Sequence, residues 1–157
     1  MSNRVGIGYD AHRLESGHDL WIGGIQIDHD KGLVGHSDGD VLIHAIVDSL
    51  LGAASLGDIG SHFPSSDSRY RGVSSLIFLE HATRLLGENG WHIVNVDATI
   101  VAEKPALAPY KSAMQRAIAN GLGVLPSVVN IKATTTDGMG FSGIGEGISS
   151  YAIASIG

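Results

Sequence analysis

The sequence contains no cysteine, and this absence removes several kinds of site at once. Disulfides, thiolate metal ligands and cysteine nucleophiles are all excluded. Any zinc site must therefore use histidine, aspartate or glutamate as its ligands. The lack of cysteine indicates the compartment only weakly, and a reducing cytoplasm is the expected default.

Positive charge is also scarce, because 10 lysines and arginines stand against 16 aspartates and glutamates, giving a net charge of −6. A broad surface for nucleic acid or for an anionic membrane is therefore not expected. Phosphate ligands remain compatible with this charge, since a metal ion, a helix N-terminus or one or two lysines can hold them.

Long hydrophobic segments are missing as well. The first ten residues have neither the apolar core of a signal peptide nor the Arg- and Ser-rich character of a transit peptide. The most apolar run, residues 41–56, contains His44 and Asp48 and is too short to span a bilayer. No repeat, linker or low-complexity segment is present, so residues 1–157 are expected to form a single domain.

Glycine, by contrast, is abundant, with 22 residues in 157, about twice the usual share. This content predicts many tight turns and close backbone approaches. The apolar patterns predict the order strand, strand, helix, helix, strand, helix, strand. That order is typical of an α/β (α+β) sandwich, with a mixed sheet covered by helices on one face.

The predicted strands span residues 5–9, 20–27, 93–102, 130–136 and 147–156, and two of the predicted helices span 74–89 and 110–120. Gly23-Gly24 and Lys31-Gly32 are expected to form turns, and Gly121 to end the second of these helices. The last strand is small or apolar on both sides, which is typical of burial on both faces. Because helices are available for one face only, we expect a second subunit to cover the other.

The central stretch, residues 36–53, begins as a polar turn and continues as a helix. Ser37 is the expected N-cap, with Asp40 completing a capping-box pattern. Asp40, His44 and Asp48 recur every four residues, so they share one helical face. This polar stripe has two explanations: a solvated outer face, or a metal-binding His44 whose second ring nitrogen is held by one of the two carboxylates.

Asp10 and His12 follow the first predicted strand and are two residues apart, so in extended backbone they point to the same side. Together with His44 they form an Asp/His/His set. Three protein ligands with an open fourth position are typical of a catalytic zinc site. The mixed nitrogen and oxygen donors also accept manganese or cobalt.

Several motifs in register resemble the 2-C-methyl-D-erythritol 2,4-cyclodiphosphate synthase family of the non-mevalonate isoprenoid pathway. The similarity covers essentially the whole chain. Its most specific part is the run from Ser37 to Ala53, which contains the central helix. The other matching motifs are Gly8-Tyr9-Asp10-x-His12, Gly57-Asp58-Ile59-Gly60, Phe63-Pro64, Lys132-Ala133-Thr134-Thr135-Thr136 and Gly145-Glu146-Gly147-Ile148.

The resemblance implies an activity, metals and an assembly. The family converts 4-diphosphocytidyl-2-C-methyl-D-erythritol 2-phosphate into the 2,4-cyclodiphosphate and CMP by intramolecular phosphoryl transfer. Zinc, or another divalent transition metal, is implied at Asp10, His12 and His44. A second ion, Mg²⁺ or Mn²⁺, is implied near Asp137. Family members are homotrimers whose active sites lie between subunits, and no nucleic-acid or membrane partner is implied.

Site roles are implied in the same way. His36 and Thr135 match positions that orient the reacting phosphates, and Asp40 and Asp48 are the expected supports of His44. The Phe63-to-Asp67 loop, with Asp58 and Gly60, matches the part that holds the methylerythritol, and the Ala102-to-Ala108 loop matches the cytidine pocket. The substrate-binding positions are Ser37, Asp58, Ile59, Gly60, Phe63, Pro64, Ser65, Ser66, Asp67, Ala102, Glu103, Lys104, Pro105, Ala106, Leu107, Ala108, Thr134, Thr136 and Phe141.

Three residues depart from the family pattern. Asp137 stands where the family has a longer glutamate, Ser65 where it often has aspartate, and Ile144 where many members have arginine. None of them belongs to the zinc set, so we expect altered affinity with the chemistry retained.

Two alternative functions fit the same residues. A zinc-dependent phosphate-ester hydrolase would use Asp48 or His36 as its general base. A non-catalytic, nucleotide-binding oligomeric module would bind CMP or CDP without turnover. Release of inorganic phosphate would favour the first alternative, and binding without product would favour the second.

Overall fold

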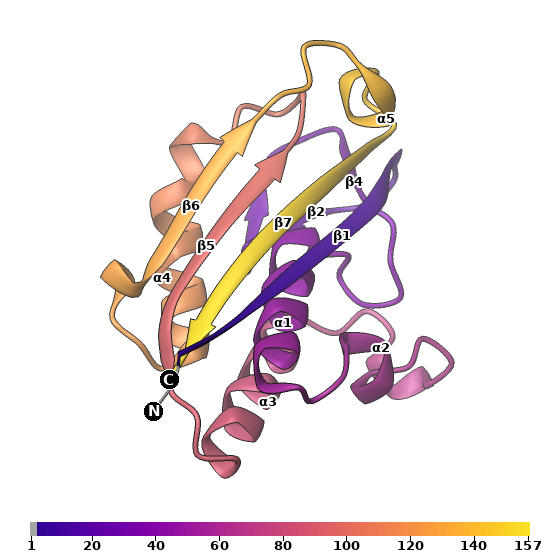
Figure 1. The fold of residues 1–157 in the computed structure, drawn as a ribbon. Coiled ribbons are helices and arrows are strands. Elements are labelled where there is room, and N and C mark those ends of the chain that lie inside the picture. The colour runs from indigo at the N-terminus through magenta and orange to yellow at the C-terminus, as the bar shows by residue number, and fades with distance from the viewer. Residues whose placement is uncertain (1–2) are drawn as a thin grey trace.

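The computed structural model describes residues 3–157 and contains a five-stranded mixed sheet in the order β4-β1-β7-β5-β6 (Figure 1). Only β5 and β6 are parallel; the other neighbours are antiparallel. The strands span β1 Arg4–Ser16, β4 Lys31–Leu33, β5 Ile93–Val101, β6 Val129–Thr134 and β7 Gly147–Ile156. A separate hairpin consists of β2 Leu20–Ile22 and β3 Ile25–Ile27, joined by the expected turn at Gly23-Gly24.

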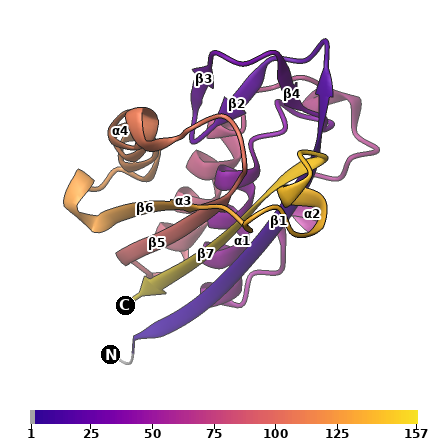
Figure 2. The same ribbon diagram turned by 90° about the horizontal axis from the view of Figure 1, so that it is seen from above.

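Three longer helices cover one face of the sheet, as Figure 2 shows from above. They are α1 Val41–Ala54, α3 Leu76–Glu88 and α4 Lys111–Leu122. Two single-turn helices, α2 Ile59–His62 and α5 Gly140–Gly143, and three 3₁₀ turns lie in the connections. The expected α+β fold with helices on one face is confirmed. Among the described residues, none of the helices has the length and hydropathy of a membrane-spanning segment.

Several predicted boundaries were wrong. β1 continues to Ser16, because its residues up to Arg13 pair with β7 and its last three residues pair with β4, so Asp10 and His12 lie within the strand. Lys31 and Gly32 belong to β4, which replaces the predicted turn. Gly121 lies inside α4, and the left-handed Gly123 ends that helix with a φ of 66°.

Helix α1 begins later than predicted, because Asp40 is its N-cap and Ser37 precedes it. The Asp40 side chain is fully buried and accepts hydrogen bonds from three backbone N–H groups, those of Gly23, Gly24 and Ile43, at 2.7–3.0 Å. This carboxylate therefore joins the β2–β3 turn to the start of α1. A solvated outer face, one of the two explanations of the polar stripe, is excluded at this position.

Replacing Asp40 with alanine is expected to cost about 3 kcal/mol of folding free energy, because three N–H groups lose their acceptor in a buried place. Chemical denaturation of the metal-free protein measures this loss. Asp40→Asn retains one acceptor oxygen and should lose less. Equal stability of Asp40→Ala and the parent protein would contradict this account of the cap.

Two glycines allow α1 to lie directly against β1. Gly6 and Gly8 face the helix, and a Cβ atom at Gly8 would overlap the carbonyl group of Ala45, while one at Gly6 would overlap that of Ser49. The backbones of β1 and α1 are in direct contact at this crossing, an approach that side chains on β1 would prevent. The close approach brings the side chains of α1 within reach of Asp10 and His12, which lie on the same face of β1.

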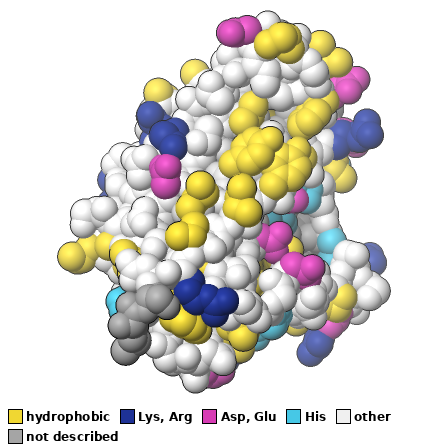
Figure 3. Space-filling view, in the orientation of Figure 1, with side chains coloured by type: hydrophobic (Ala, Val, Ile, Leu, Met, Phe, Trp, Pro, Cys, Tyr) yellow, Lys and Arg dark blue, Asp and Glu magenta, His cyan; other side chains and the backbone are white. Residues whose placement is uncertain are grey.

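The opposite face of β1 and β7 is apolar and uncovered in a single chain (Figure 3). Val5 and Ile7 are 67% and 70% exposed, and Tyr9 packs on Tyr151 with ring centroids 4.9 Å apart. Ile153, opposite Ile7, is also exposed. Tyr151 and Ile153 of β7 are exposed on this face, so the single chain leaves uncovered the side of β7 that a second subunit is expected to cover.

Candidate metal centre

Three side chains converge between β1 and α1. Asp10 Oδ2 lies 2.8 Å from His12 Nε2 and 3.0 Å from His44 Nδ1, and the two ring nitrogens are 3.2 Å apart. β1 contributes the first two residues on its helix-facing side, and α1 contributes the third. The predicted Asp/His/His set is thus brought together, and among the described residues it is the group of such side chains that could hold a metal ion.

The geometry of these atoms fits a tetrahedral metal ion. In a tetrahedron with metal–ligand bonds of about 2.0–2.1 Å, ligand atoms are about 3.3 Å apart, close to the spacing found here. His12 is oriented by a hydrogen bond of 2.7 Å from Nδ1 to the carbonyl oxygen of Val34. Since a carbonyl only accepts, Nδ1 carries a hydrogen, and in the neutral imidazole Nε2 is then the nitrogen with the free lone pair that a metal ion can bind.

The same contacts alter the pKa values of two of the three side chains. Burial favours the neutral form of Asp10, but hydrogen bonds from His12 and His44 outweigh burial and lower the pKa of its carboxyl to about 2. Burial also opposes protonation of His12, yet the hydrogen bond and charge of Asp10 outweigh it and raise the pKa of the imidazole above 6.5. Without metal, His12 is therefore protonated more readily than a free imidazole.

Metal binding is expected to strengthen with pH, because a metal ion must displace the proton that His12 retains above pH 6.5. Affinity should rise by about tenfold per pH unit up to the raised pKa of His12 and then level off. Asp10 adds no slope in this range, since its carboxyl is already ionised. Zinc titrations against a competing chelator between about pH 6 and 9 measure the slope; a flat profile would show that His12 is not a ligand.

A cavity of about 240 Å³ opens beside the cluster. It brings together eight of the predicted site residues and two others, Tyr70 and Phe78, and two of the three converging side chains, His12 and His44, form part of its wall. Its lining consists of His12, His36, Ser37, His44, Ile59, Gly60, Phe63, Ser65, Tyr70 and Phe78. A metal ion bound to the three side chains would therefore border a cavity large enough for a small molecule.

The loop beyond α2 is fastened to this cavity by hydrogen bonds. His36 Nε2 donates to the carbonyl oxygen of Asp67 at 2.8 Å, and the Gly72 N–H donates to that of His36. Phe63 packs between Tyr70 and Phe78 at centroid distances of 5.2 and 4.3 Å. The predicted methylerythritol loop is thereby held over the cavity.

The remaining residues of that loop lie at its rim. Asp58 is exposed and caps α2, accepting hydrogen bonds from the N–H and hydroxyl of Ser61. Pro64 and Ser66 are exposed, and Asp67 starts the next 3₁₀ turn and pairs with Arg69. None of these four lines the cavity in the single chain.

The predicted nucleotide half of the site lies elsewhere. Thr134 ends β6, in the same row as Ala11 of β1, with β5 and β7 between them. Three strand spacings amount to about 14 Å. Among residues 3–157, no member of the Ala102-to-Ala108 loop or of the Thr134-to-Asp137 turn lines the cavity at the metal ligands.

These two segments form a surface of their own. The Glu103 carboxylate accepts a hydrogen bond of 2.7 Å from the Gly138 N–H, which joins the loop to the turn. Thr135 and Asp137 contact each other, with Asp137 in the left-handed conformation at a φ of 54°. Asp, which tolerates this conformation better than most residues, thus directs its side chain back toward Thr135.

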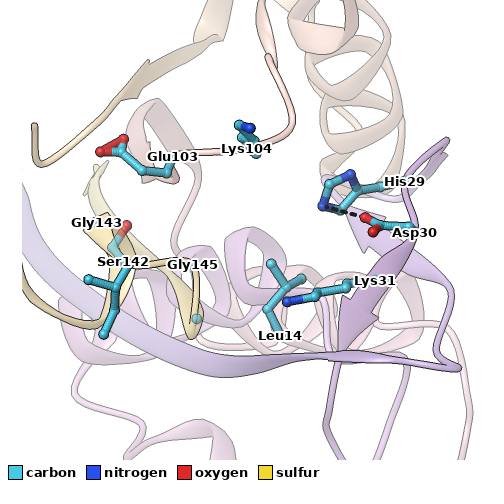
Figure 4. Close-up of a pocket in the computed structure, with 11 residues that line it drawn as sticks. Leu14, His29, Asp30, Lys31, Glu103, Lys104, Ser142, Gly143 and Gly145 are labelled. Atoms are coloured by element: carbon cyan, nitrogen blue, oxygen red, sulfur yellow. Dashed lines mark ion pairs between the residues drawn. The ribbon is translucent and has the colours of Figure 1, made fainter. Parts of the chain in front are cut away.

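Glu103 and Lys104 also border a separate cavity of about 320 Å³ (Figure 4). Figure 4 shows His29, Asp30 and Lys31 on the opposite wall, and Ser142 to Gly145 beside Glu103. Ile144, one of the three departures from the family pattern, also lines it and is 66% exposed. Phe141 lies against Gly147 in a third cavity, which includes His12 and Arg13.

The predicted supports of His44 were wrong. Asp40 binds backbone N–H groups, and Asp48 accepts from the Ile59 N–H at 2.7 Å. The outer ring nitrogen of His44 instead contacts Ser75 Oγ at 2.8 Å and Ser37 Oγ at 3.1 Å. Sequence reasoning missed Ser75 because it lies 31 residues away, at the start of α3, where serine is an ordinary helix-start residue.

Comparison with known proteins agrees with this geometry. A 2-C-methyl-D-erythritol 2,4-cyclodiphosphate synthase of Alkaliphilus metalliredigens is 57% identical over 154 residues, covering 98% of this chain and 97% of that protein. IspF of Plasmodium falciparum in complex with CDP superposes with a TM-score of 0.87 at 31% identity, covering 99% and 96% of the two chains.

A bifunctional protein shows the same fold. The structure of IspDF from Campylobacter jejuni matches with a TM-score of 0.95 at 37% identity, covering 99% of this chain, which spans 42% of that longer protein. A model of the YgbB family matches residues 3–157. The resemblance read from the motifs is confirmed, and the chain belongs to the YgbB family.

Proposed function

We propose that this protein converts 4-diphosphocytidyl-2-C-methyl-D-erythritol 2-phosphate into 2-C-methyl-D-erythritol 2,4-cyclodiphosphate and CMP, acting in the cytoplasm as a phosphorus–oxygen lyase. The observation that carries the proposal is the Asp10, His12 and His44 cluster at the mouth of a cavity that His36 and Ser37 also line. The names of the relatives reported above support the same activity.

The reaction needs no covalent enzyme intermediate. An oxygen of the 2-phosphate forms a bond to the β-phosphorus, the bond from that phosphorus to the oxygen bridging to the α-phosphorus breaks, and CMP leaves with the bridging oxygen. The protein has to fold the substrate back on itself and balance charge on the phosphates.

The residues around the cavity fit these tasks. His36 and Ser37 are placed to orient the phosphates, and Asp58 and Gly60, with the Phe63-to-Asp67 loop, to hold the hydroxyl groups of the methylerythritol. We assign cytosine binding to the Ala102-to-Ala108 loop and phosphate contacts to Thr134, Thr135 and Thr136. Phe141 would border the substrate on the side of His12.

Asp10, His12 and His44 are proposed to hold zinc or another divalent transition metal, and Asp137 a Mg²⁺ or Mn²⁺ ion. The two ions would supply positive charge that polarises the phosphates and eases departure of CMP. The donor set of one carboxylate and two imidazoles suits zinc. Asp137 lies beside Thr135, where a carboxylate can reach phosphate-bound magnesium directly or through water.

Phosphorus NMR tests the activity directly. The protein is incubated with the cytidine diphosphate 2-phosphate substrate and Mg²⁺, with a parallel sample containing a chelator. Two coupled resonances of the cyclic diphosphate, together with CMP and absent in the chelated sample, are expected. Inorganic phosphate without cyclic product, or unchanged substrate with the folded, metal-loaded protein, would overturn the proposal.

A homotrimer would complete the site. The metal half and the nucleotide half are about three strands apart in one chain, so one copy does not bring them together. The uncovered face formed by Val5, Ile7, Tyr9, Tyr151 and Ile153 offers the apolar surface that subunit contacts bury. We propose that three copies pack through this face and that each active site combines halves from two neighbours.

Mixing two inactive proteins should restore activity if the sites are shared. His44→Ala removes the metal half, and the double variant Thr135→Ala, Asp137→Ala removes the other half. After unfolding and refolding an equal mixture, about a quarter of the parental activity is expected, because three quarters of random trimers are mixed and each has one intact site of three. Light scattering gives the mass; a monomer, or a trimeric mixture without activity, would contradict shared sites.

A further inference from the structure

The outer side of His44 carries a hydrogen-bonded chain that none of the predicted roles uses. His44 is the ligand that α1 supplies, and its Nδ1 faces Asp10 and His12. Its other nitrogen, Nε2, lies 2.8 Å from Ser75 Oγ. Ser75 Oγ in turn donates to a carboxylate oxygen of Asp38. The chain runs from His44 in α1 to Ser75, which precedes α3, and ends at Asp38.

The direction of these hydrogen bonds follows from the end of the chain. An ionised carboxylate only accepts, so the Ser75 hydroxyl hydrogen points to Asp38. The lone pairs of Ser75 Oγ are then free to accept from His44. With a metal ion on Nδ1, the hydrogen of the neutral imidazole resides on Nε2, which is the atom that faces Ser75.

The position of Ser75 favours this contact with His44. It is fully buried and stands at the N-cap position of α3, where a serine side chain normally accepts from a backbone N–H of the helix. Here the side chain makes no such cap. Its hydroxyl group contacts His44 and Asp38 instead. Ser75 therefore does not stabilise α3 by a side-chain cap, and its side chain serves the metal site.

Asp38 accepts two hydrogen bonds from Ser75. One carboxylate oxygen accepts from the Ser75 hydroxyl, and the other accepts from the Ser75 N–H at 2.8 Å. The first oxygen also accepts from the Asp40 N–H at 3.1 Å, next to the start of α1. Asp38 therefore fixes the hydroxyl group relative to both helices.

We propose that Ser75 and Asp38 are positioning residues for the metal ligand His44, and that they increase its affinity for the metal ion. Asp38 would stabilise the positive charge that a bound metal ion induces on the imidazole, and Ser75 would transmit this effect while holding the ring plane. The inference rests on the metal site of the proposed function. It adds to that function the two residues that position the ligand His44.

Ser37 has a different part in this arrangement. Its hydroxyl also contacts His44 Nε2, but at 3.1 Å and from a less buried position on the cavity wall. When Ser37 turns to a phosphate, Ser75 remains on the ring. Two serines on one nitrogen thus allow a substrate contact to form without releasing the ligand.

The test compares metal affinity in Ser75→Ala and in its matched control, Ser74→Ala. Ser74 is the adjacent serine, exposed and without contact to His44. Zinc affinity, measured by competition with a chromophoric chelator, should fall about 10- to 100-fold in Ser75→Ala and stay within about twofold in Ser74→Ala. Parental affinity in a folded Ser75→Ala protein would overturn the proposal.

A second variant and a second measurement cover the case in which Ser75→Ala does not fold. Asp38→Asn keeps the serine and removes the charge, and a smaller loss of affinity is expected. In the zinc-loaded parent, NMR should show the His44 Nε2 proton far downfield and slow to exchange with water. Exchange should accelerate in both variants; an unshifted, equally protected proton in Asp38→Asn would contradict the chain.

These readouts separate this inference from the proposed function. If the protein makes no cyclic product but Ser75→Ala still weakens zinc binding, the proposed reaction fails and the support of His44 stands. If product forms and Ser75→Ala binds zinc as the parent does, the reaction stands and the support fails.

Discussion

A His44→Ala protein is expected to fold and to have no measurable cyclodiphosphate synthase activity. The substitution removes one of the three proposed metal ligands, and the loss of affinity should exceed the roughly 10- to 100-fold loss typical of changes to supporting residues. The fold should survive because the apolar residues of α1 pack in the core, whereas His44 lies on the side facing the cavity. Phosphorus NMR of the product and a zinc titration measure the two effects.

His18→Ala is the matched control, since His18 lies in an exposed turn away from the cluster. Its activity and zinc affinity should equal those of the parent. Circular dichroism of the metal-free proteins establishes that both variants are folded. Turnover by His44→Ala at the parental rate would show that this residue is not a ligand.

Of the substitutions that add one methyl group to the sheet, Gly8→Ala is expected to destabilise the protein most. The new Cβ would overlap the carbonyl group of Ala45 in α1, and a backbone cannot turn aside as a side chain does. Overpacking against side chains costs about 1–3 kcal/mol, so we expect about 3 kcal/mol or more here, or roughly 6–12 °C in Tm.

Metal affinity should fall in the same protein, because moving α1 away from β1 also moves His44 away from Asp10 and His12. Gly87→Ala is the control: Gly87 lies in α3 with no atom within 4 Å of an added Cβ. That change should stabilise the protein by about 0.5–1 kcal/mol. A Gly8→Ala protein with parental melting and zinc binding would rule out the close crossing of helix and strand.

The sequence predicts for a physical reason that Asp10 and His12 lie together at the candidate metal centre. Asp10 and His12 are two residues apart in a strand, and residues two apart lie on the same face whatever the length of the strand. Their partner His44 follows from the type of donor and from the family motif. The sequence alone does not give the distance between β1 and α1, which depends on the contact of two glycines with helix backbone.

The supports of His44 could not be predicted in this way. Helical spacing points to Asp40 and Asp48, but a residue at the N-cap directs its side chain to backbone N–H groups, and Asp48 has a nearer donor in Ile59. Ser75 reaches His44 through tertiary packing of α3 on α1. The beginning of α1 was predicted three residues early because Ser37 and Asp40 both have the chemistry of a cap.

Helix α1 connects three parts of the molecule at intervals of four residues. Asp40 holds the β2–β3 turn, His44 the metal site, and Asp48 the start of α2. Each residue of a helix advances the direction of its side chain by about 100°. One inserted residue between Asp40 and Asp48 would therefore rotate one attachment away from the others. The chain length of this segment is fixed by helical phase, whereas the open turn at Gly17 can change length without disturbing the site.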